Sequence, residues 1–306
     1  MNTLYNIYYS FPSFTFLGKF GKGINYAMGR VLKVLLDRQV PSHMEKTAAR
    51  AGSGISNAGG EVNYIVSLTS FPARINDVWI SVETILRQSF KPDMIILWLA
   101  EEQFPDKKIP EKLAKLQDRG LTIKYCDDLR SHKKYYYTLK EYPNANIITL
   151  DDDLYYDKDV LKNVVELHKK YPDCIATNRA HEIIIKDGKV LPYRKWNHNA
   201  TNIIKPSHLL LQTGGAGTLY PPGSLHPDVL DKKLIKELCF HADDVWLKMM
   251  AYLNGTKIVT NKKYDKDPIT VSSTQNEKLV STNVIHGGND TQLNNILNYY
   301  NIEIKE

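Results

Sequence analysis

Three consecutive carboxylates, Asp151, Asp152 and Asp153, follow a short apolar run in the middle of the chain. Adjacent carboxylates repel one another, and burying any of them without a partner is costly. We therefore expect them at the carboxyl end of a strand, where an α/β sheet opens into a ligand crevice. Asp151 and Asp153 could share a divalent cation there, because Mg²⁺ takes one or two protein carboxylates together with water and phosphate oxygens. The alternative is a solvated acidic turn.

A second acidic pair, Asp243 and Asp244, begins an apolar stretch of helical length that ends near Leu253. A carboxylate in this position can accept the proton of a reacting hydroxyl group. It can equally cap the helix and complement the helix dipole. We take Asp244 as the first candidate for a general base and Asp243 as the second.

Basic and acidic residues near the predicted strand ends are candidates for binding a nucleotide. Lys133 and Lys134 precede the central strand and could reach a phosphate, or they form a solvated face. Arg74 follows the first strand and could contact a base or phosphate. Asp127 ends the third strand, where it could bind ribose or the base, or simply form a turn.

A glycine-rich segment, Gly214-Gly-Ala-Gly217, lies later in the chain. Glycines allow the backbone to approach a ligand closely, although they also serve tight turns. A polar, irregular region precedes it and contains Trp196, which is a candidate substrate contact together with Gly214, Gly215 and Ala216.

Alternating strands and helices position these residues. Apolar runs predict strands over 64–70, 94–99 and 121–125, and a central strand that leads into Asp151. Helices are predicted between them and after the central strand, at 77–88, 110–119, 133–142 and 157–171. This alternation indicates an α/β fold with a mostly parallel sheet flanked by helices on both faces. Further along, the chain predicts a hairpin over 182–192, a helix over 243–253, a strand over 257–260 and a short helix over 290–299.

The predicted organisation has three parts. Residues 1–40 form an amphipathic segment with five basic residues and one acidic residue, a net charge of +4. Such a helix can lie on an anionic membrane surface, or it can pack on the domain that follows. Residues 41–61 have the composition of a flexible linker. Residues 62–306 form the main domain, which divides into 62–156 and 157–306.

Composition narrows the class of protein. The 306 residues are 42% hydrophobic and 24% charged, as in ordinary globular proteins. The net charge is +6, so only about +2 remains outside the first 40 residues, too little to indicate nucleic-acid binding. Three distant cysteines fit a reducing compartment. No apolar run is long enough to span a bilayer, and we expect a cytoplasmic protein, peripheral on the inner membrane face.

With these motifs in this order, the chain over about 62–300 resembles glycosyltransferases of the GT-A fold, most closely the family 2-like bacterial enzymes of surface polysaccharide synthesis. The segment from Ser67 to Arg74, which includes Thr69, looks like the first strand and loop that hold the nucleotide. Asp151-Asp-Asp153 looks like the Asp-x-Asp motif for metal and diphosphate. Gly214-Gly-Ala-Gly217 resembles the loop before the acceptor site, and Asp243-Asp244-x-Trp246 resembles the motif with the catalytic base.

The resemblance implies a GT-A-like, Rossmann-like nucleotide-sugar domain that binds Mn²⁺ or Mg²⁺ and a nucleoside-diphosphate sugar donor, with UDP-sugar the first candidate. It implies transfer of a hexosyl-type sugar to a hydroxyl of a glycan or lipid-linked saccharide, with inversion. Asp152 then belongs to the nucleotide-binding set, and residues 62–156 and 157–306 correspond to a nucleotide-sugar half and an acceptor half. By the same resemblance, His286 is a candidate third metal ligand, like a late histidine in some GT-A families; an exposed loop histidine is the alternative. Two alternatives remain open: a HAD-like metal-dependent phosphohydrolase, whose strand also ends in Asp-x-Asp, and a non-catalytic sugar-binding module that uses the region 193–202.

Overall fold

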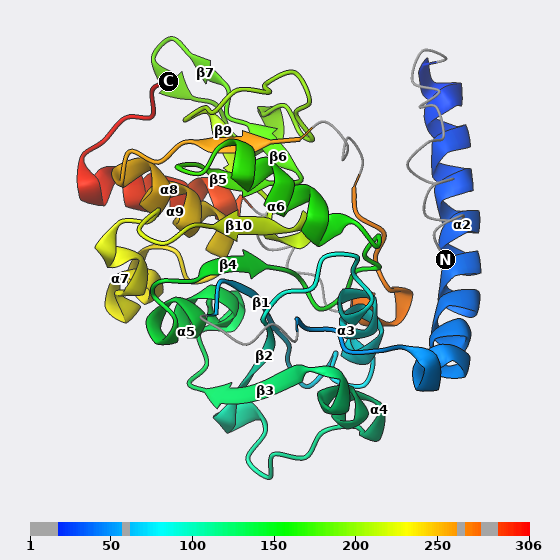
Figure 1. The fold of residues 1–306 in the computed structure, drawn as a ribbon. Coiled ribbons are helices and arrows are strands. Elements are labelled where there is room, and N and C mark those ends of the chain that lie inside the picture. Colours follow the sequence, from blue (N-terminus) through cyan, green and yellow to red (C-terminus); the bar gives the residue numbers. More distant parts are fainter. Residues whose placement is uncertain (1–17, 57–61, 262–266, 277–286) are drawn as a thin grey trace.

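The protein is described here from a computed structural model, which places residues 18–56, 62–261, 267–276 and 287–306. A seven-stranded sheet crosses the molecule (Figure 1). In order across the sheet, its strands are β11 (Ile258–Thr260), β5 (Ile175–Thr177), β10 (Thr218–Tyr220), β4 (Asn146–Thr149), β1 (Tyr64–Thr69), β2 (Met94–Ala100) and β3 (Leu121–Cys126). Only β10 runs antiparallel to its neighbours, β4 and β5. The predicted α/β fold with a mostly parallel sheet is therefore confirmed.

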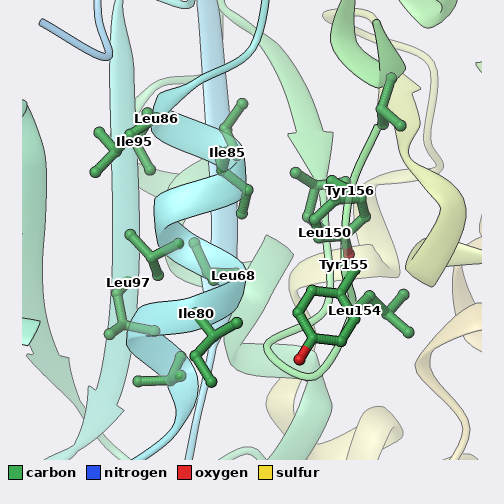
Figure 2. Close-up of a cluster of buried hydrophobic side chains, with 14 of the residues drawn as sticks. Leu68, Ile80, Ile85, Leu86, Ile95, Leu97, Leu150, Leu154, Tyr155 and Tyr156 are labelled. Carbon is green, nitrogen blue, oxygen red and sulfur yellow. The ribbon is translucent and has the colours of Figure 1, made fainter. Parts of the chain in front are cut away.

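Side chains of the central strands alternate between the two faces of the sheet, as strand geometry requires. On one face, Leu68 and Ile95 pack with the helix α3 (Val78–Leu86), as Figure 2 shows. On the other face, Ile65 and Trp98 belong to a separate cluster, which includes partly buried side chains of α5 (Lys133–Glu141). The strands are buried on both faces, which explains why they are almost continuously apolar in sequence.

The second half of the chain builds its core around α8 (Asp243–Leu253), whose Trp246, Met249 and Met250 are buried. The other helices of this half are α6 (Val160–Lys170), α7 (Lys232–Leu238) and α9 (Gly288–Tyr300). A two-stranded sheet pairs β6 (Ala180–Glu182) with β9 (Leu210–Gln212). The hairpin of β7 (Ile185–Lys186) and β8 (Lys189–Val190) turns at Asp187 and Gly188, both with positive φ, as the sequence predicts. The short α4 (Glu111–Ala114) belongs to the first half, where its Leu113 is buried.

The helix α2 (Gly18–Thr47) stands at the side of the domain, with its C-terminal end beside α3 (Figure 1). It continues past residue 40, where the sequence predicts a linker, and contains Pro41. The helix persists there because Leu36, Val40 and Met44 are buried in the core that also contains α3. Beyond it, the amide groups of Gly54 and Ser56 donate to the carbonyls of Arg119 and Pro92, both at 2.8 Å. The predicted flexible linker is thus wrong over residues 41–56.

Among the residues that the structure describes, no helix combines the length and the apolarity needed to cross a membrane.

Candidate active site

A cleft of about 1090 Å³ lies where β1, β3 and β4 end, and it reaches the first turn of α8. Parallel strands place their carboxyl ends at one edge of a sheet, which is where α/β proteins bind ligands. The two acidic motifs predicted from sequence are far apart in the chain, and both line this cleft. The predicted site residues in its wall are Thr69, Arg74, Lys133, Lys134, Asp151, Asp152, Asp153, Gly215, Asp243 and Asp244.

Asp152 connects the end of β4 to the loop after β1. Its carboxylate accepts hydrogen bonds from the Ser70 hydroxyl at 2.6 Å and the Arg74 guanidinium at 2.7 Å. Burial raises the pKa of Asp152 even though Arg74 opposes the shift. Arg74 also lies 3.2 Å from a carboxylate oxygen of Asp153. Asp152 therefore fixes the shape of the loop, while Arg74 brings a guanidinium to the acidic cluster.

Lys134, on the first turn of α5, joins the two acidic motifs. Its ammonium lies 2.8 Å from Asp151 Oδ1 and 2.8 Å from Asp243 Oδ2. Burial disfavours this charge, but Asp151, Asp243 and Asp244 outweigh burial and raise the pKa of Lys134 well above its usual value. In turn, burial opposes ionisation of Asp243, and Lys134 outweighs it, so that the pKa of Asp243 is lowered.

Asp244 has a different environment from its neighbour. Its Oδ1 accepts a hydrogen bond from the Gly214 amide at 3.0 Å, so the side chain faces the glycine-rich loop. Burial, and then repulsion from Asp243, raise the pKa of Asp244 to about 7. The N-cap residue of α8 is Ala242, and it makes no side-chain cap hydrogen bond. A half-buried carboxyl group with a pKa near neutrality is well suited to accept a proton.

The glycine-rich loop includes a short 3-10 helix, Gly214–Ala216, and it lies directly against Asp151. A Cβ atom on Gly215 would lie 2.6 Å from Asp151 Oδ2, so no larger residue fits there without movement. The Tyr156 hydroxyl joins the same parts of the chain, since it lies 2.8 Å from the Asp151 amide nitrogen and 3.0 Å from the Gly215 carbonyl oxygen. Ala216, in contrast, is buried outside the cleft wall.

The positions of Asp127 and Trp196 do not support the sequence predictions for these two residues. Asp127 does not line the cleft, and it forms an exposed ion pair with Lys232 at 2.6 Å. Its neighbour Asp128 lines the cleft instead, because successive residues at a strand end point in opposite directions. The Asp128 carboxylate is paired with Lys133. Trp196 is only 5% exposed, and its Nε1 donates to the Leu191 carbonyl at 2.6 Å, so it is a core residue rather than a substrate contact. His286 lies outside the described residues.

The implied divalent cation can be tested against the carboxylates of the cleft. In the described part of the chain, no set of three or more His, Cys, Asp or Glu side chains is placed to hold a metal ion. Asp151 and Asp153 retain side-chain exposures of 36% and 14%, and both line the cleft. Two carboxylates of this kind fit a cation that is held jointly with phosphate oxygens, which is the usual mode for Mg²⁺.

Sequence reasoning missed several residues of the cleft wall, in particular Arg179, His181, Tyr193 and His198. They belong to β6, the residue before it, and the loop that follows the β7–β8 hairpin. The only signal in the sequence was the aromatic and polar composition of 193–202. That composition does not tell which ring is buried and which faces the cleft.

No family model matches the chain, and no curated protein matches it. Among solved structures, the chain is similar to the crystal structure of S. aureus TarS 1-349, with 15% sequence identity and a TM-score of 0.43. The match covers 67% of this chain and 59% of that chain, so this chain spans less than two thirds of the solved structure. The activity therefore has to be argued from the chemistry of the cleft.

Proposed function

We propose that the protein is a GT-A-type glycosyltransferase that moves a sugar from a nucleoside-diphosphate sugar to a hydroxyl group of a saccharide acceptor. The observation that carries this proposal is the joining of the two acidic motifs in one cleft by Lys134, which lies 2.8 Å from both Asp151 and Asp243. The motif Asp151–Asp153 could bind the donor diphosphate together with a divalent cation. The motif Asp243–Asp244 could remove the proton of the acceptor hydroxyl. Transfer of a sugar from the diphosphate to the acceptor hydroxyl requires both acidic motifs in one cavity.

The donor's leaving group is the nucleoside diphosphate, whose negative charge grows as the bond to the sugar breaks. Arg74 and Lys134 present a guanidinium and an ammonium to this region, and preorganised charges in a buried site stabilise such a transition state. A divalent cation held by Asp151 and Asp153 would supply further positive charge to the phosphate oxygens. Thr69 and Asp128, at the ends of β1 and β3, also line the cleft and are the proposed contacts of the nucleoside, with UDP the first candidate.

Asp244 is the proposed general base. In the transfer step, the acceptor oxygen forms a bond to the anomeric carbon while the bond from that carbon to the diphosphate oxygen breaks. The proton of the acceptor hydroxyl moves to the Asp244 carboxylate, and the electron pair of the broken bond leaves with the diphosphate. A single displacement of this kind inverts the anomeric carbon. The pKa of about 7 places the base close to the optimum for proton transfer near neutral pH.

The acceptor class and the location are further parts of the proposal. We infer a glycan or lipid-linked saccharide acceptor in bacterial surface polysaccharide synthesis, on the cytoplasmic face of the inner membrane. Support comes from α2, where Tyr26, Val31 and Val34 are exposed by 67%, 61% and 51%, next to the exposed Arg30. Apolar and basic side chains on one helix are suited to an anionic lipid surface.

The test is a donor screen followed by a base variant. UDP-sugars are incubated with Mn²⁺, with and without simple pyranoside acceptors, and the release of UDP and of inorganic phosphate is measured. We expect acceptor-stimulated release of UDP, and a loss of roughly 10²–10⁴ in kcat for Asp244→Asn, the range for a missing general base. The exposed Asp118→Asn is the matched control and should keep full activity.

Two results would overturn the proposal. Release of inorganic phosphate independent of acceptor would indicate a phosphohydrolase. Binding of saccharide with no turnover of any nucleotide sugar would indicate a sugar-binding module.

A further inference from the structure

Three rings pack together, two of the pairs edge to face, in one part of the cleft wall. They are His181 of β6, Tyr193 of the 3-10 helix Tyr193–Lys195, and His198 of the loop that follows. The ring centroids of His181 and His198 are 4.5 Å apart, those of Tyr193 and His198 are 5.1 Å apart, and those of His181 and Tyr193 are 5.8 Å apart. We call these three residues the ring platform.

Hydrogen bonds and ring packing hold the platform in place. The amide of Tyr193 donates to Asp290 Oδ1 at 2.7 Å, and its ring packs against the buried Trp196 with a centroid distance of 5.1 Å. The amide of Asn199 donates to His181 Nδ1 at 3.0 Å. Side chains that are fixed before a ligand arrives lose little conformational entropy on binding, and this lowers the cost of recognition.

The buried ring of the platform, that of His181, is uncharged. Burial, and then the neighbouring Arg179 and His198, lower the pKa of His181 to about 3, so its imidazole is neutral at physiological pH. Arg179, at the edge of the platform, is paired with Asp267 at 2.6 Å and donates to the Thr213 hydroxyl at 3.0 Å. The cleft wall here thus combines aromatic rings with polar, charge-balanced groups, the usual lining of a small-molecule pocket.

The position of Tyr193 relates the platform to the proposed base. Tyr193 and Asp244 line the same cleft, and after burial the Asp244 carboxylate is the largest cause that raises the pKa of Tyr193. The proposed binding site of the diphosphate, in contrast, contains Asp151 and Arg74. A ligand that rests on the rings would therefore be near the base.

We propose that Tyr193, His198 and His181 bind an uncharged pyranose ring of the acceptor, with its reacting hydroxyl directed to Asp244. The apolar C–H face of a pyranose would lie on the rings, and its hydroxyl groups would meet the polar rim. This inference rests on the proposed transferase function and names the class of acceptor that its site takes.

The test uses the full chain with UDP, Mn²⁺ and a set of neutral p-nitrophenyl pyranosides as probes. Binding of UDP is measured by calorimetry, and binding of each pyranoside by saturation-transfer NMR. We expect at least one neutral pyranoside to bind. Tyr193→Ala and His198→Ala should each weaken it by roughly three- to tenfold, the effect of one lost ring contact, with UDP affinity unchanged. Tyr193→Phe keeps the ring and should keep most of the binding.

Controls separate the platform from folding and from the transferase proposal itself. Tyr299→Ala removes an aromatic ring that is 56% exposed on α9 and does not line the cleft, and it should change neither ligand. His198 is exposed, so its variant keeps the fold if Tyr193→Ala does not. If UDP binds but no neutral pyranoside does, or if both alanine variants bind the pyranoside normally, the platform proposal is overturned while the transferase remains. If UDP itself does not bind, the transferase proposal fails.

Discussion

Asp151 and Asp243, which are 92 residues apart in sequence, are bound by the same cation, the ammonium of Lys134, at 2.8 Å from each. One carboxylate ends the central strand and the other begins α8, so Lys134 fixes the distance between the two halves of the site. Its charge also affects Asp244, whose pKa Lys134 lowers against the stronger effects of burial and of Asp243. The same side chain therefore sets both the geometry and the acidity of the candidate base.

Replacing Lys134 by methionine should shift the pH dependence of transfer to higher pH. The base must be ionised to accept a proton, so in the wild-type enzyme kcat/KM should rise with pH through about 7. Without the Lys134 ammonium, the pKa of Asp244 rises further. The pH at which kcat/KM reaches half of its maximum should therefore be higher than in the wild-type enzyme. The free energy of unfolding should fall by about 3–5 kcal/mol, because buried carboxylates lose their partner. The pH–rate profile and urea unfolding measure the two effects.

Lys232→Met is the matched control for this variant. Lys232 also pairs with an aspartate, Asp127 at 2.6 Å, but the side chains are 37% and 75% exposed. A surface pair contributes at most about 1 kcal/mol, and this one lies outside the cleft. A midpoint that stays at the wild-type pH in Lys134→Met would show that Lys134 does not govern the base.

Asp244→Asn should be more stable than the wild-type protein at pH 8, although it is inactive. The folded-state pKa of Asp244 is raised to about 7, so the folded protein binds this proton more tightly than the unfolded chain. The sign follows: this carboxyl group makes the protein less stable as pH rises from about 4 to about 7, and the full cost is present above 7. Asparagine removes that cost and keeps an oxygen for the Gly214 amide.

The expected gain for Asp244→Asn at pH 8 is roughly 1–4 kcal/mol in the free energy of unfolding, and it should shrink towards pH 4. Urea unfolding at several pH values measures it, with Asp118→Asn as the exposed control. If Asp244→Asn is less stable than the wild type at pH 8, the ionised Asp244 carboxylate does not destabilise the folded protein, and the prediction is wrong.

Sequence patterns predict those parts of the fold whose signal is local. The strands β1, β2 and β3 and the helix α8 have long apolar runs, and their positions agree with the prediction. The strand β10 has only three residues, and what defines it is antiparallel pairing with β4 and β5, which no local pattern encodes. Its insertion next to the central strand brings the glycine-rich loop against Asp151.

The candidate site shows the same division between local and long-range information. Carboxylates that follow an apolar run mark the acidic motifs, but the contact from Lys134 to Asp243 depends on packing across the sheet. Around residue 196, composition indicates aromatic rings near a ligand. Burial then decides that Trp196 joins the core while Tyr193 lines the cleft. Both rings have the same local sequence environment, so the sequence cannot separate them.

Gly215→Ala should weaken donor binding strongly while changing stability little. The added Cβ atom would lie 2.6 Å from Asp151 Oδ2, so the carboxylate has to move away from its position beside Lys134. We expect a loss of at least about tenfold in affinity for UDP with Mn²⁺, equivalent to about 1.4 kcal/mol. Gly52→Ala is the control, since nothing lies within 4 Å of its added Cβ. Unchanged UDP affinity in Gly215→Ala would show that Asp151 does not contact the donor.

The helix α2 should divide into a part that stabilises the fold and a part that binds membrane. Met44 is 1% exposed in the core shared with α3, and Met44→Ala should cost about 2–5 kcal/mol of stability without changing vesicle binding.

Arg30 and Arg38 are exposed on the same helix, and each basic residue near an anionic surface contributes about 1 kcal/mol. Reversing both to glutamate should reduce cosedimentation with phosphatidylglycerol vesicles by at least about tenfold and leave unfolding unchanged. Reversal of both Lys107 and Lys108, which are 58% and 87% exposed on the main domain, is the charge-matched control. If the double arginine variant still sediments with these vesicles like the wild type, α2 is a structural helix only.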